Sequence, residues 1–448
     1  MRKATLPLLW LFCLLVLIGC GVPSAGSRGG ASSQPTNAPT QAARAACPQV
    51  PAAQPGQAPT APLSLYVRGA NGTDLEALNP GDGTLRWQDV VDVAPGWVTA
   101  VAVAQNIVYV VTSEGTLSAL NASDGHARWC TSLSATAEPR ERGEAEREWP
   151  NPVRPSGSGE AQPTNTPLWS RVAVDQQTVY AAGNSGSSLV ALNASDGKER
   201  WRAQPTPNDV TALLAARGLA YVTPGASSCG AISALNASDG HEAWCFQTPH
   251  GLLSPPAMID GVLYLSEAGA PGSAGVLDAL NASDGSRRWQ AQESQGSTGE
   301  LQPAGADGVV YIADSGGVSA FSASDGAKRW HVSQPIVEAG PAASNGLVYV
   351  GSVDETGAPI IFTLSAATGQ PQWQTPLSER SQAAIALQRP LASSSAAGPV
   401  FNGLSVVNGF VVVSYISTTP TATPSIAALN AGTGQRGWTA QGILLAAG

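Results

Sequence analysis

The sequence predicts an all-β fold, namely an eight-bladed β-propeller of four-stranded antiparallel blades whose ring is closed by the C-terminal strand. The first observation is a repeat: eight times, an Asp-Gly or Thr-Gly pair is followed after three residues by Trp. The second is the period of about 42 residues, which is typical of four-stranded propeller blades. The third is the order within each unit, in which short apolar runs alternate with turn signals and therefore predict strands joined by hairpins.

The repeat has two constant residues that we single out as its structural positions. The glycines are Gly83, Gly125, Gly197, Gly240, Gly285, Gly326, Gly369 and Gly434. The tryptophans are Trp87, Trp129, Trp201, Trp244, Trp289, Trp330, Trp373 and Trp438. Because the spacing is the same in every unit, a shared packing role is favoured over a stacking platform for sugars or bases.

Residues 257–289 illustrate the four strands of one unit. Apolar runs at 257–259, 262–265, 276–280 and 286–289 are separated by Asp260-Gly261, a variable loop and Asn281-Ala282-Ser283-Asp284-Gly285. Asp-Gly favours the positive backbone angles of a tight hairpin. A tyrosine recurs in the second run of seven units, and the Trp falls in the last run. We therefore expect the Trp on the outermost strand, where its ring can cover the seam with the next blade.

The chain begins with the pattern of an export signal. Arg2 and Lys3 precede an apolar stretch that ends before Gly19 and Cys20, which predicts a signal peptide over residues 1–19. Residues 17–20 resemble the lipobox of bacterial lipoproteins, and this resemblance implies cleavage before Cys20 and lipidation of that residue. An ordinary signal with an incidental Cys is the alternative. Residues 20–62 are rich in Pro, Ser, Thr and Ala, and this composition predicts a disordered tether.

The propeller is expected to occupy residues 63–448. Its first unit begins at the second-strand pattern, so we expect residues 442–446 to supply the missing strand and close the ring. Two units are lengthened by insertions at about 137–167 and 376–402. The first insertion contains a run of mixed charges, which is either a solvated loop or an arm that binds a partner.

The repeat resembles that of the quinoprotein-type (PQQ-like) propellers. Ala-Leu-Asn-Ala-Ser-Asp-Gly followed by three residues and Trp, as at 119–129, is similar to the family's repeat, and eight copies cover about residues 63–448. Together with the lipobox, the chain resembles the outer-membrane assembly lipoproteins of the BamB family. That resemblance implies a non-catalytic eight-bladed propeller that assists a β-barrel assembly machine. The longer tether and the two insertions depart from that family.

Enzyme chemistry is not supported by the residues. The repeat is similar to that of the quinone-dependent dehydrogenases, and this resemblance implies adjacent cysteines beside the cofactor. No Cys-Cys pair occurs in this sequence. The repeated aspartates are explained as turn residues. The four histidines, His126, His241, His250 and His331, lack metal-ligand spacing. We therefore predict no catalytic, cofactor-binding or metal-binding residue and no cofactor.

Four cysteines follow Cys20 in the predicted exported chain, namely Cys47, Cys130, Cys229 and Cys245. Four cysteines allow three pairings. Cys229 and Cys245 flank one outer hairpin, so we favour that disulfide, with Cys47–Cys130 as the other.

The resulting functional hypothesis is a non-catalytic protein scaffold, anchored to a membrane through lipid and working in the cell envelope, with outer-membrane protein assembly as its leading role. The net charge of −9 argues against a nucleic-acid partner. Envelope proteins are the expected partners, with the chain monomeric or part of a hetero-complex. The anchor is expected in the outer membrane facing the periplasm where there are two membranes, and on the outer face of the cell membrane where there is one. The alternatives are an extracytoplasmic sensor or ligand-capture protein and, from the enzyme class, a PQQ-dependent dehydrogenase.

Overall fold

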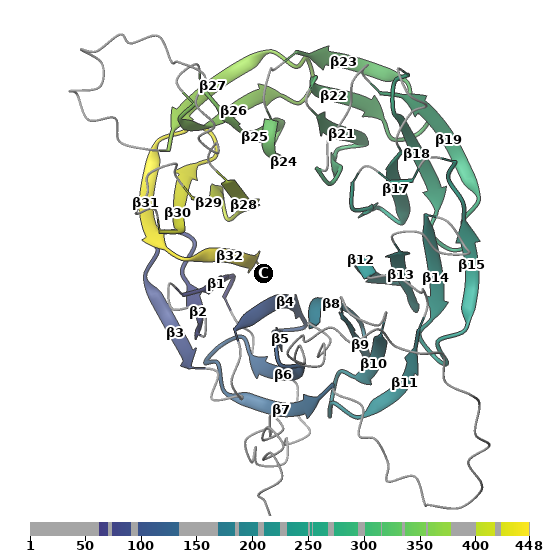
Figure 1. Ribbon diagram of the computed structural model, residues 1–448. Coiled ribbons are helices and arrows are strands. Elements are labelled where there is room, and N and C mark those ends of the chain that lie inside the picture. Colours follow the sequence, from purple (N-terminus) through teal and green to yellow (C-terminus); the bar gives the residue numbers. More distant parts are fainter. Residues whose placement is uncertain are drawn as a thin grey trace, which may run out of the picture. The chain divides into compact units, whose positions relative to one another are not determined.

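The computed structural model describes most of the predicted propeller. The described residues are 62–69, 74–90, 97–133, 169–183, 188–204, 210–224, 231–249, 251–252, 254–267, 273–293, 301–314, 316–333, 337–354, 357–377, 400–416 and 423–447. All regular elements in these ranges are β-strands. They form eight four-stranded antiparallel sheets that are arranged as blades around a central axis (Figure 1). The predicted eight-bladed propeller is confirmed.

Each blade contributes one strand to each of four concentric positions. The innermost strands are β4 (Val98–Ala104), β8 (Trp169–Asp175), β12 (Val210–Ala216), β16 (Ala257–Ile259), β20 (Ala304–Ala306), β24 (Val337–Ser344), β28 (Val400–Val407) and β32 (Ile443–Ala447). The second strands are β1 (Leu65–Arg68), β5 (Ile107–Thr112), β9 (Thr178–Gly183), β13 (Leu219–Pro224), β17 (Val262–Glu267), β21 (Val309–Asp314), β25 (Leu347–Val353) and β29 (Phe410–Ile416).

The two outer positions complete the blades. The third strands are β2 (Asp74–Leu78), β6 (Thr116–Asn121), β10 (Leu189–Asn193), β14 (Ile232–Asn236), β18 (Val276–Asn281), β22 (Gly317–Ser322), β26 (Pro359–Ser365) and β30 (Ser425–Asn430). The outermost strands are β3 (Leu85–Val90), β7 (Ala127–Ser132), β11 (Glu199–Ala203), β15 (Glu242–Phe246), β19 (Arg287–Gln292), β23 (Lys328–Val332), β27 (Pro371–Pro376) and β31 (Arg436–Gln441).

We number the blades along the chain. Blade 1 combines β32 with β1–β3, and blades 2 to 8 are the successive groups of four strands from β4–β7 to β28–β31. In blade 1 the C-terminal strand pairs antiparallel with β1, so that Leu65 lies opposite Ala447 and Val67 opposite Leu444. The predicted closure is therefore confirmed, and it pairs an edge of β1 that an open array would leave exposed.

The hydrophobic cores lie between blades. One buried cluster joins Tyr66 and Trp87 of blade 1 to Val108 and Val110 of blade 2, and seven further clusters occupy the other joints in the same way. The second strands are covered on both faces by neighbouring blades. This explains why β5 and β17 are buried along their whole length.

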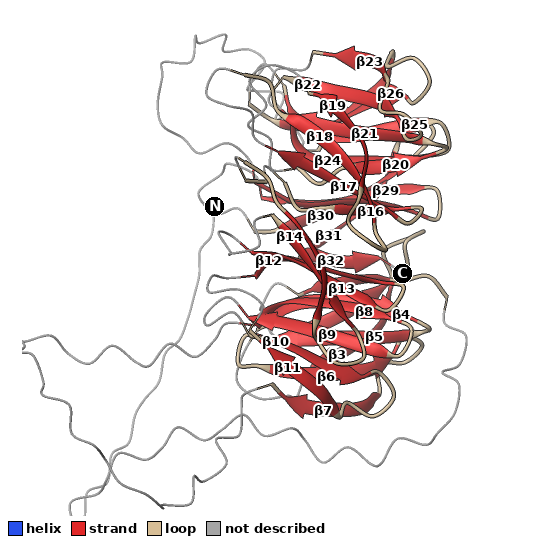
Figure 2. Ribbon diagram, turned by 90° about the vertical axis from the view of Figure 1, so that its right-hand side faces the viewer, coloured by secondary structure: helices blue, strands red, loops and turns tan. Residues whose placement is uncertain are grey.

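Two kinds of turn lie on one face of the ring, which we call the turn face. The antiparallel order places the turn between the first and second strands of a blade on the same side as the turn between its third and fourth strands (Figure 2). The two turns touch: for example, the Ala122 amide donates to Asn106 O at 2.9 Å. In the inner turns Asp260 and Gly261 have φ of 49° and 78°, as expected for a tight hairpin.

The described residues contain no helix of the length and apolar character needed to span a membrane. The predicted signal peptide at 1–19 and most of the tether at 20–62 lie outside the described residues, as does nearly all of the insertions at 137–167 and 376–402. Strand β27 extends to Pro376 and β28 begins at Val400, so the ends of the second insertion continue into strands.

Candidate functional site

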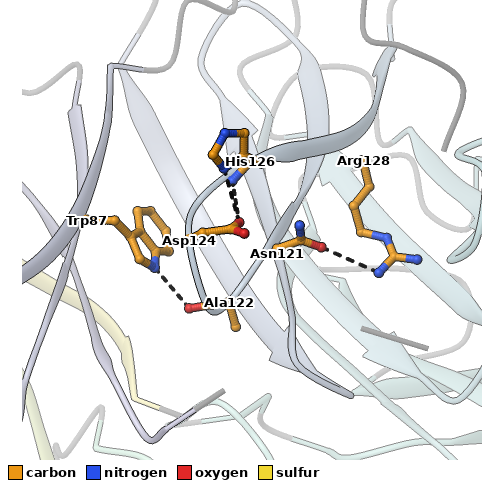
Figure 3. Close-up of polar contacts among 6 residues, drawn as sticks. All are labelled: Trp87, Asn121, Ala122, Asp124, His126 and Arg128. Atoms are coloured by element: carbon orange, nitrogen blue, oxygen red, sulfur yellow. Dashed lines mark hydrogen bonds and ion pairs between the residues drawn. The ribbon is translucent and has the colours of Figure 1, made fainter. Parts of the chain in front are cut away.

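The eight repeat tryptophans lie on the outermost strands and reach across the joints. Trp87 Nε1 of blade 1 donates to Ala122 O of blade 2 at 2.9 Å (Figure 3). The same bond recurs in six further joints, with Ala194, Ala237, Ala282, Ala323, Ala366 and Pro80 as acceptors. Trp373 Nε1 is buried without a hydrogen-bond partner. Because these rings join neighbouring blades, they are not exposed as a stacking platform.

Each repeat glycine lies against the tryptophan of the preceding blade. A Cβ atom built on these glycines would approach an indole carbon to within 2.5–2.8 Å, closer than carbon atoms pack. Their φ angles of 68° to 75° also favour glycine. The pairs, in chain order of the glycine, are Gly83–Trp438, Gly125–Trp87, Gly197–Trp129, Gly240–Trp201, Gly285–Trp244, Gly326–Trp289, Gly369–Trp330 and Gly434–Trp373. Glycine and tryptophan therefore act together as one contact between blades.

The repeated aspartates shape the outer turns. Asp284 Oδ1 accepts the Ser286 amide at 2.9 Å and the Ser286 hydroxyl at 2.6 Å, and these bonds lower the pKa of Asp284. Asp82, Asp124, Asp196, Asp239 and Asp325 accept the equivalent amide. Thr368 and Thr433 accept it through their hydroxyls at 3.3 Å. These side chains are thus used locally by the turn, as the sequence predicts.

Two of the four predicted disulfide cysteines are described. Cys130 on β7 and Cys245 on β15 are each disulfide-bonded. The other two, Cys47 and Cys229, and the predicted lipidation residue Cys20 lie outside the described residues. The pairing and the lipidation therefore stay predictions.

A group of buried acidic side chains distinguishes blade 5. Asp278 is fully buried, Glu267 is 3% exposed and Glu293 is 5% exposed. Arg287 Nε donates to Asp278 Oδ1 at 2.6 Å, and Ser266 Oγ donates to Glu293 Oε1 at 2.6 Å. Burial and the neighbouring Asp278 raise the pKa of Glu267 to about 8. The arrangement holds a proton on Glu267 at neutral pH.

A polar cavity of about 680 Å³ lies at the turn face in the joint between blades 2 and 3. Blade 2 contributes its inner turn with Gln105 and Asn106 and, from its strands, Tyr109 and Arg128. Blade 3 contributes its inner turn, Gln176 and Gln177, and part of its outer turn. Arg128 Nη1 is 3.5 Å from Asn121 Oδ1 (Figure 3). The walls combine carboxamides, one guanidinium and a tyrosine ring.

Calcium bound beside a quinone needs several oxygen ligands, carboxylates above all. In the part of the chain that the structure describes, no three His, Cys, Asp or Glu side chains lie together in an arrangement that could hold a metal ion. The innermost strands around the axis are rich in small residues, as in β4 (Val98–Ala104) and β20 (Ala304–Ala306). The described residues thus do not fit a calcium-quinone site.

Sequence analysis missed both the acidic group and the cavity, although each carries a signal. Glu293 stands four residues after Trp289. The equivalent position in two other blades is a buried leucine, Leu133 or Leu377. At the cavity, Gln-Asn and Gln-Gln occupy inner turns where the later blades have a residue followed by Gly. Both signals are departures from the repeat, which a search for shared residues overlooks.

Comparisons with known proteins agree with the propeller. A family model described as "Outer membrane protein assembly factor BamB" matches residues 71–140, 147–313 and 314–447. No curated protein matches the sequence significantly. Among solved structures, BamB from Moraxella catarrhalis is 18% identical with a TM-score of 0.52, and the match covers 82% of this chain and 92% of that one.

Two dehydrogenases are also similar in structure. Quinohemoprotein alcohol dehydrogenase from Comamonas testosteroni is 14% identical with a TM-score of 0.51, covering 84% of this chain and 70% of that one. The dihydro-heme d1 dehydrogenase NirN is 10% identical with a TM-score of 0.56, covering 89% and 78%. At such identities these likenesses concern the fold and not the activity.

Proposed function

The chain belongs to the family of the outer membrane protein assembly factor BamB, and from this membership we propose that it is a non-catalytic scaffold that binds other proteins in the cell envelope. The specific role proposed is assistance in outer-membrane protein assembly. The observation that carries the proposal is the match of the family model to most of the chain, including residues 314–447 at its C-terminal end. The fold alone does not distinguish this role, because dehydrogenases share it.

The geometry of the repeat supports a binding role over an enzymatic one. The residues that recur in every blade are engaged within the ring: tryptophan and glycine at the joints, and aspartate or threonine in the turns. None of them is left to act on a substrate. A closed ring with a core at each joint is a rigid support, and rigid supports commonly present their contacts on loops.

The proposed site of action depends on Cys20. Acyl chains on this residue would hold the protein at a membrane surface without a spanning helix. We propose the outer membrane, facing the periplasm, in a cell with two membranes. In a cell with one membrane the protein would stand on its outer face.

The experiment is an affinity purification of the full chain from detergent-solubilised envelopes, with the Cys20→Ala variant as a matched control. We expect β-barrel assembly components to co-purify with the wild-type protein and a lipid-modified N-terminal peptide to be found by mass spectrometry only when Cys20 is present. Recovery of the intact protein without any barrel-assembly component would refute the assembly role. An unmodified Cys20 would refute the lipid anchor. The scaffold role would then be decided by the proteins that co-purify with the chain.

The proposed lack of catalysis has a separate test. The purified protein is titrated with pyrroloquinoline quinone in the presence of calcium, and dye reduction is followed with alcohols as substrates. We expect neither saturable binding nor alcohol-dependent reduction. Saturable binding together with alcohol-dependent reduction would show a dehydrogenase.

A further inference from the structure

The cavity between blades 2 and 3 is bordered by the two inner turns that lack glycine. In blades 4 to 8 the second residue of the inner turn is Gly218, Gly261, Gly308, Gly346 or Gly409, each with φ between 72° and 78°. Blades 2 and 3 have Gln105-Asn106 and Gln176-Gln177 instead, and both turns line the cavity. The departure from the repeat is therefore confined to the two neighbouring turns that meet at one hollow.

One of these turns holds a polar side chain at a cost in backbone energy. Asn106 has φ of 61° at the second position of its turn, where the later blades have glycine, which adopts this left-handed region more easily. At the first position Gln105 and Gln176 have φ of 51° and 42°, as the first residue of the later turns also has a positive φ. Residues held in such conformations cluster at binding sites. A turn with glycine at its second position would form more readily, so the hairpin itself does not explain Asn106.

The joint is well packed around the cavity. Trp129 Nε1 donates to Ala194 O at 2.9 Å, and Thr131 Oγ1 donates to Gly197 O at 2.8 Å. Arg202 of blade 3 donates to Leu133 O of blade 2 at 3.1 Å. The hollow is therefore part of a joint that is firmly connected elsewhere, and its volume falls in the range of small-molecule sites.

The cavity walls match a ligand rich in hydroxyl groups. Gln105, Gln176 and Gln177 each carry a carbonyl acceptor and an amino donor, and Asn193, whose side chain hydrogen-bonds Asp196, adds a further carboxamide. Hydroxyl groups both donate and accept, so they are suited to carboxamides. Ile107 and the Tyr109 ring supply an apolar part of the wall, as sugar rings require on their less polar faces.

Among the described lining residues one side chain is charged, and it is positive. Arg128 is half-buried and donates from Nη1 to Asn121 Oδ1, and the part of the lining that the structure describes contains no Asp or Glu. A guanidinium binds a carboxylate through paired hydrogen bonds. The same charge acts on Tyr109. Burial raises the pKa of Tyr109 to about 12, and the positive charge of Arg128 opposes part of this rise.

A peptide fits this place less well. Extended peptides are commonly bound by adding a strand to an exposed sheet edge. The cavity instead lies at the turns, and the neighbouring strands β5 and β9 are paired on both sides. The edges of β5 and β9 are therefore not available for main-chain recognition.

We propose that the cavity between blades 2 and 3 binds an acidic saccharide, with the carboxamides of the two glutamine-bearing turns on its hydroxyl groups and Arg128 on its carboxylate. This site does not depend on the proposed scaffold role, because it is formed within one chain. It would bring the protein to a polysaccharide or glycolipid that carries uronic or sialic acid.

The test is calorimetric titration of the full chain with digalacturonate and sialyllactose, with neutral lactose as the reference sugar. We expect at least one acidic sugar to bind, lactose to bind about tenfold or more weakly, and Arg128→Gln to weaken the acidic sugar about tenfold or more. Arg288→Gln is the matched control, because Arg288 holds the same strand position and bonds Asn281 Oδ1 at 2.6 Å but lines no part of the cavity.

A second variant replaces Gln176 and Gln177 by the Asp-Gly pair of blades 5 and 6. It retains a favourable hairpin turn, so we expect unchanged or higher thermal stability together with weakened sugar binding. The proposal is overturned if neither acidic sugar binds at millimolar concentration, if lactose binds equally well, or if Arg128→Gln and Arg288→Gln have the same effect. Displacement of a bound sugar by an acidic tripeptide of higher affinity would assign the cavity to peptides instead.

Discussion

At the scale of single residues, the acidic group of blade 5 is the clearest exception to the repeat. Glu267 Oε1 and Asp278 Oδ2 are buried, and burial together with a hydrogen bond to Asp278 raises the pKa of Glu267. Arg287 and Gln290 bond the other oxygen of Asp278. Two neighbouring carboxylates with one guanidinium cannot both be ionised at low cost. Folding therefore favours a protonated Glu267.

This proton makes stability depend on pH. The pKa of Glu267 rises on folding from an ordinary value of 4.5 to about 8, so its stabilising effect is complete below pH 4.5 and is lost as the pH rises through about 8. We expect the Tm of the wild-type protein to fall by several degrees between pH 5.5 and 8.5. The turn aspartates stay ionised in this range, because hydrogen bonds such as those to Asp284 lower their pKa.

Glu267→Gln keeps a donor toward Asp278 but does not titrate, and its Tm should change less with pH. Glu338→Gln on strand β24 is the control, because Glu338 is exposed. Thermal unfolding across this pH range is the measurement. A slope in Glu267→Gln as steep as in the wild-type protein would exclude Glu267 as the group responsible.

At the scale of elements, the outer turn of one blade and the outer strand of the preceding blade form a single contact. In the joint between blades 5 and 6, Trp289 Nε1 donates to Ala323 O at 2.9 Å, and Gly326 lies beneath the ring. The tyrosine of the same blade, Tyr264, packs on Trp289 with ring centroids 5.8 Å apart. The repeat therefore encodes a joint as well as a blade.

Gly326→Ala tests this joint against Gly346→Ala, which has the same backbone strain without the contact. Gly326 has φ of 73° and a Cβ there would be 2.6 Å from the Trp289 ring, whereas Gly346 has φ of 75° and open space. We expect Gly326→Ala to lower the free energy of unfolding by about 2–4 kcal/mol, against about 1–2 kcal/mol for Gly346→Ala. Denaturant unfolding measures both.

A double-mutant cycle with Trp289→Phe identifies the cause. Phe is a smaller ring, so it should relieve part of the clash, and the two substitutions should couple by about 1 kcal/mol or more. Equal losses for Gly326→Ala and Gly346→Ala, or strict additivity with Trp289→Phe, would show that ring contact does not determine the need for glycine at Gly326.

At the scale of the whole ring, stability depends on closure. All eight hydrophobic clusters span two blades, and the cluster between blades 8 and 1 contains Leu444 of β32 together with Leu65 and Val412. A blade without a neighbour would expose one side of its core. Strand β32 thus completes blade 1 and also covers part of the joint that closes the ring.

A chain that ends at Gly442 should lose this closure. We expect a lower Tm and the formation of dimers or larger species, because the unpaired edge of β1 would be open to strand pairing. Size-exclusion chromatography with light scattering and thermal unfolding are the measurements. A synthetic peptide of residues 443–448 should restore the monomer, and a truncated chain that stays monomeric with unchanged Tm would contradict the closing role of β32.

The sequence by itself determined the propeller, its eight blades and the closing strand. This was possible because turn signals and apolar runs are local and recur in every unit, so each copy supports the interpretation of the others. Even the pairing of β32 with β1 followed from counting strands. The role of tryptophan at the seams was also expected from the sequence, but its glycine partner in the next blade was not.

Only the tertiary structure decided what the departures from the repeat do. Glu267, Asp278 and Glu293 are separated along the chain, and their shared burial arises because β17, β18 and the residue that follows β19 lie together in blade 5. Likewise, Arg128 and Gln176 belong to different blades and meet across one joint. A repeat specifies what all blades have in common through local spacing, whereas a site depends on distances between residues that only the packed ring brings together.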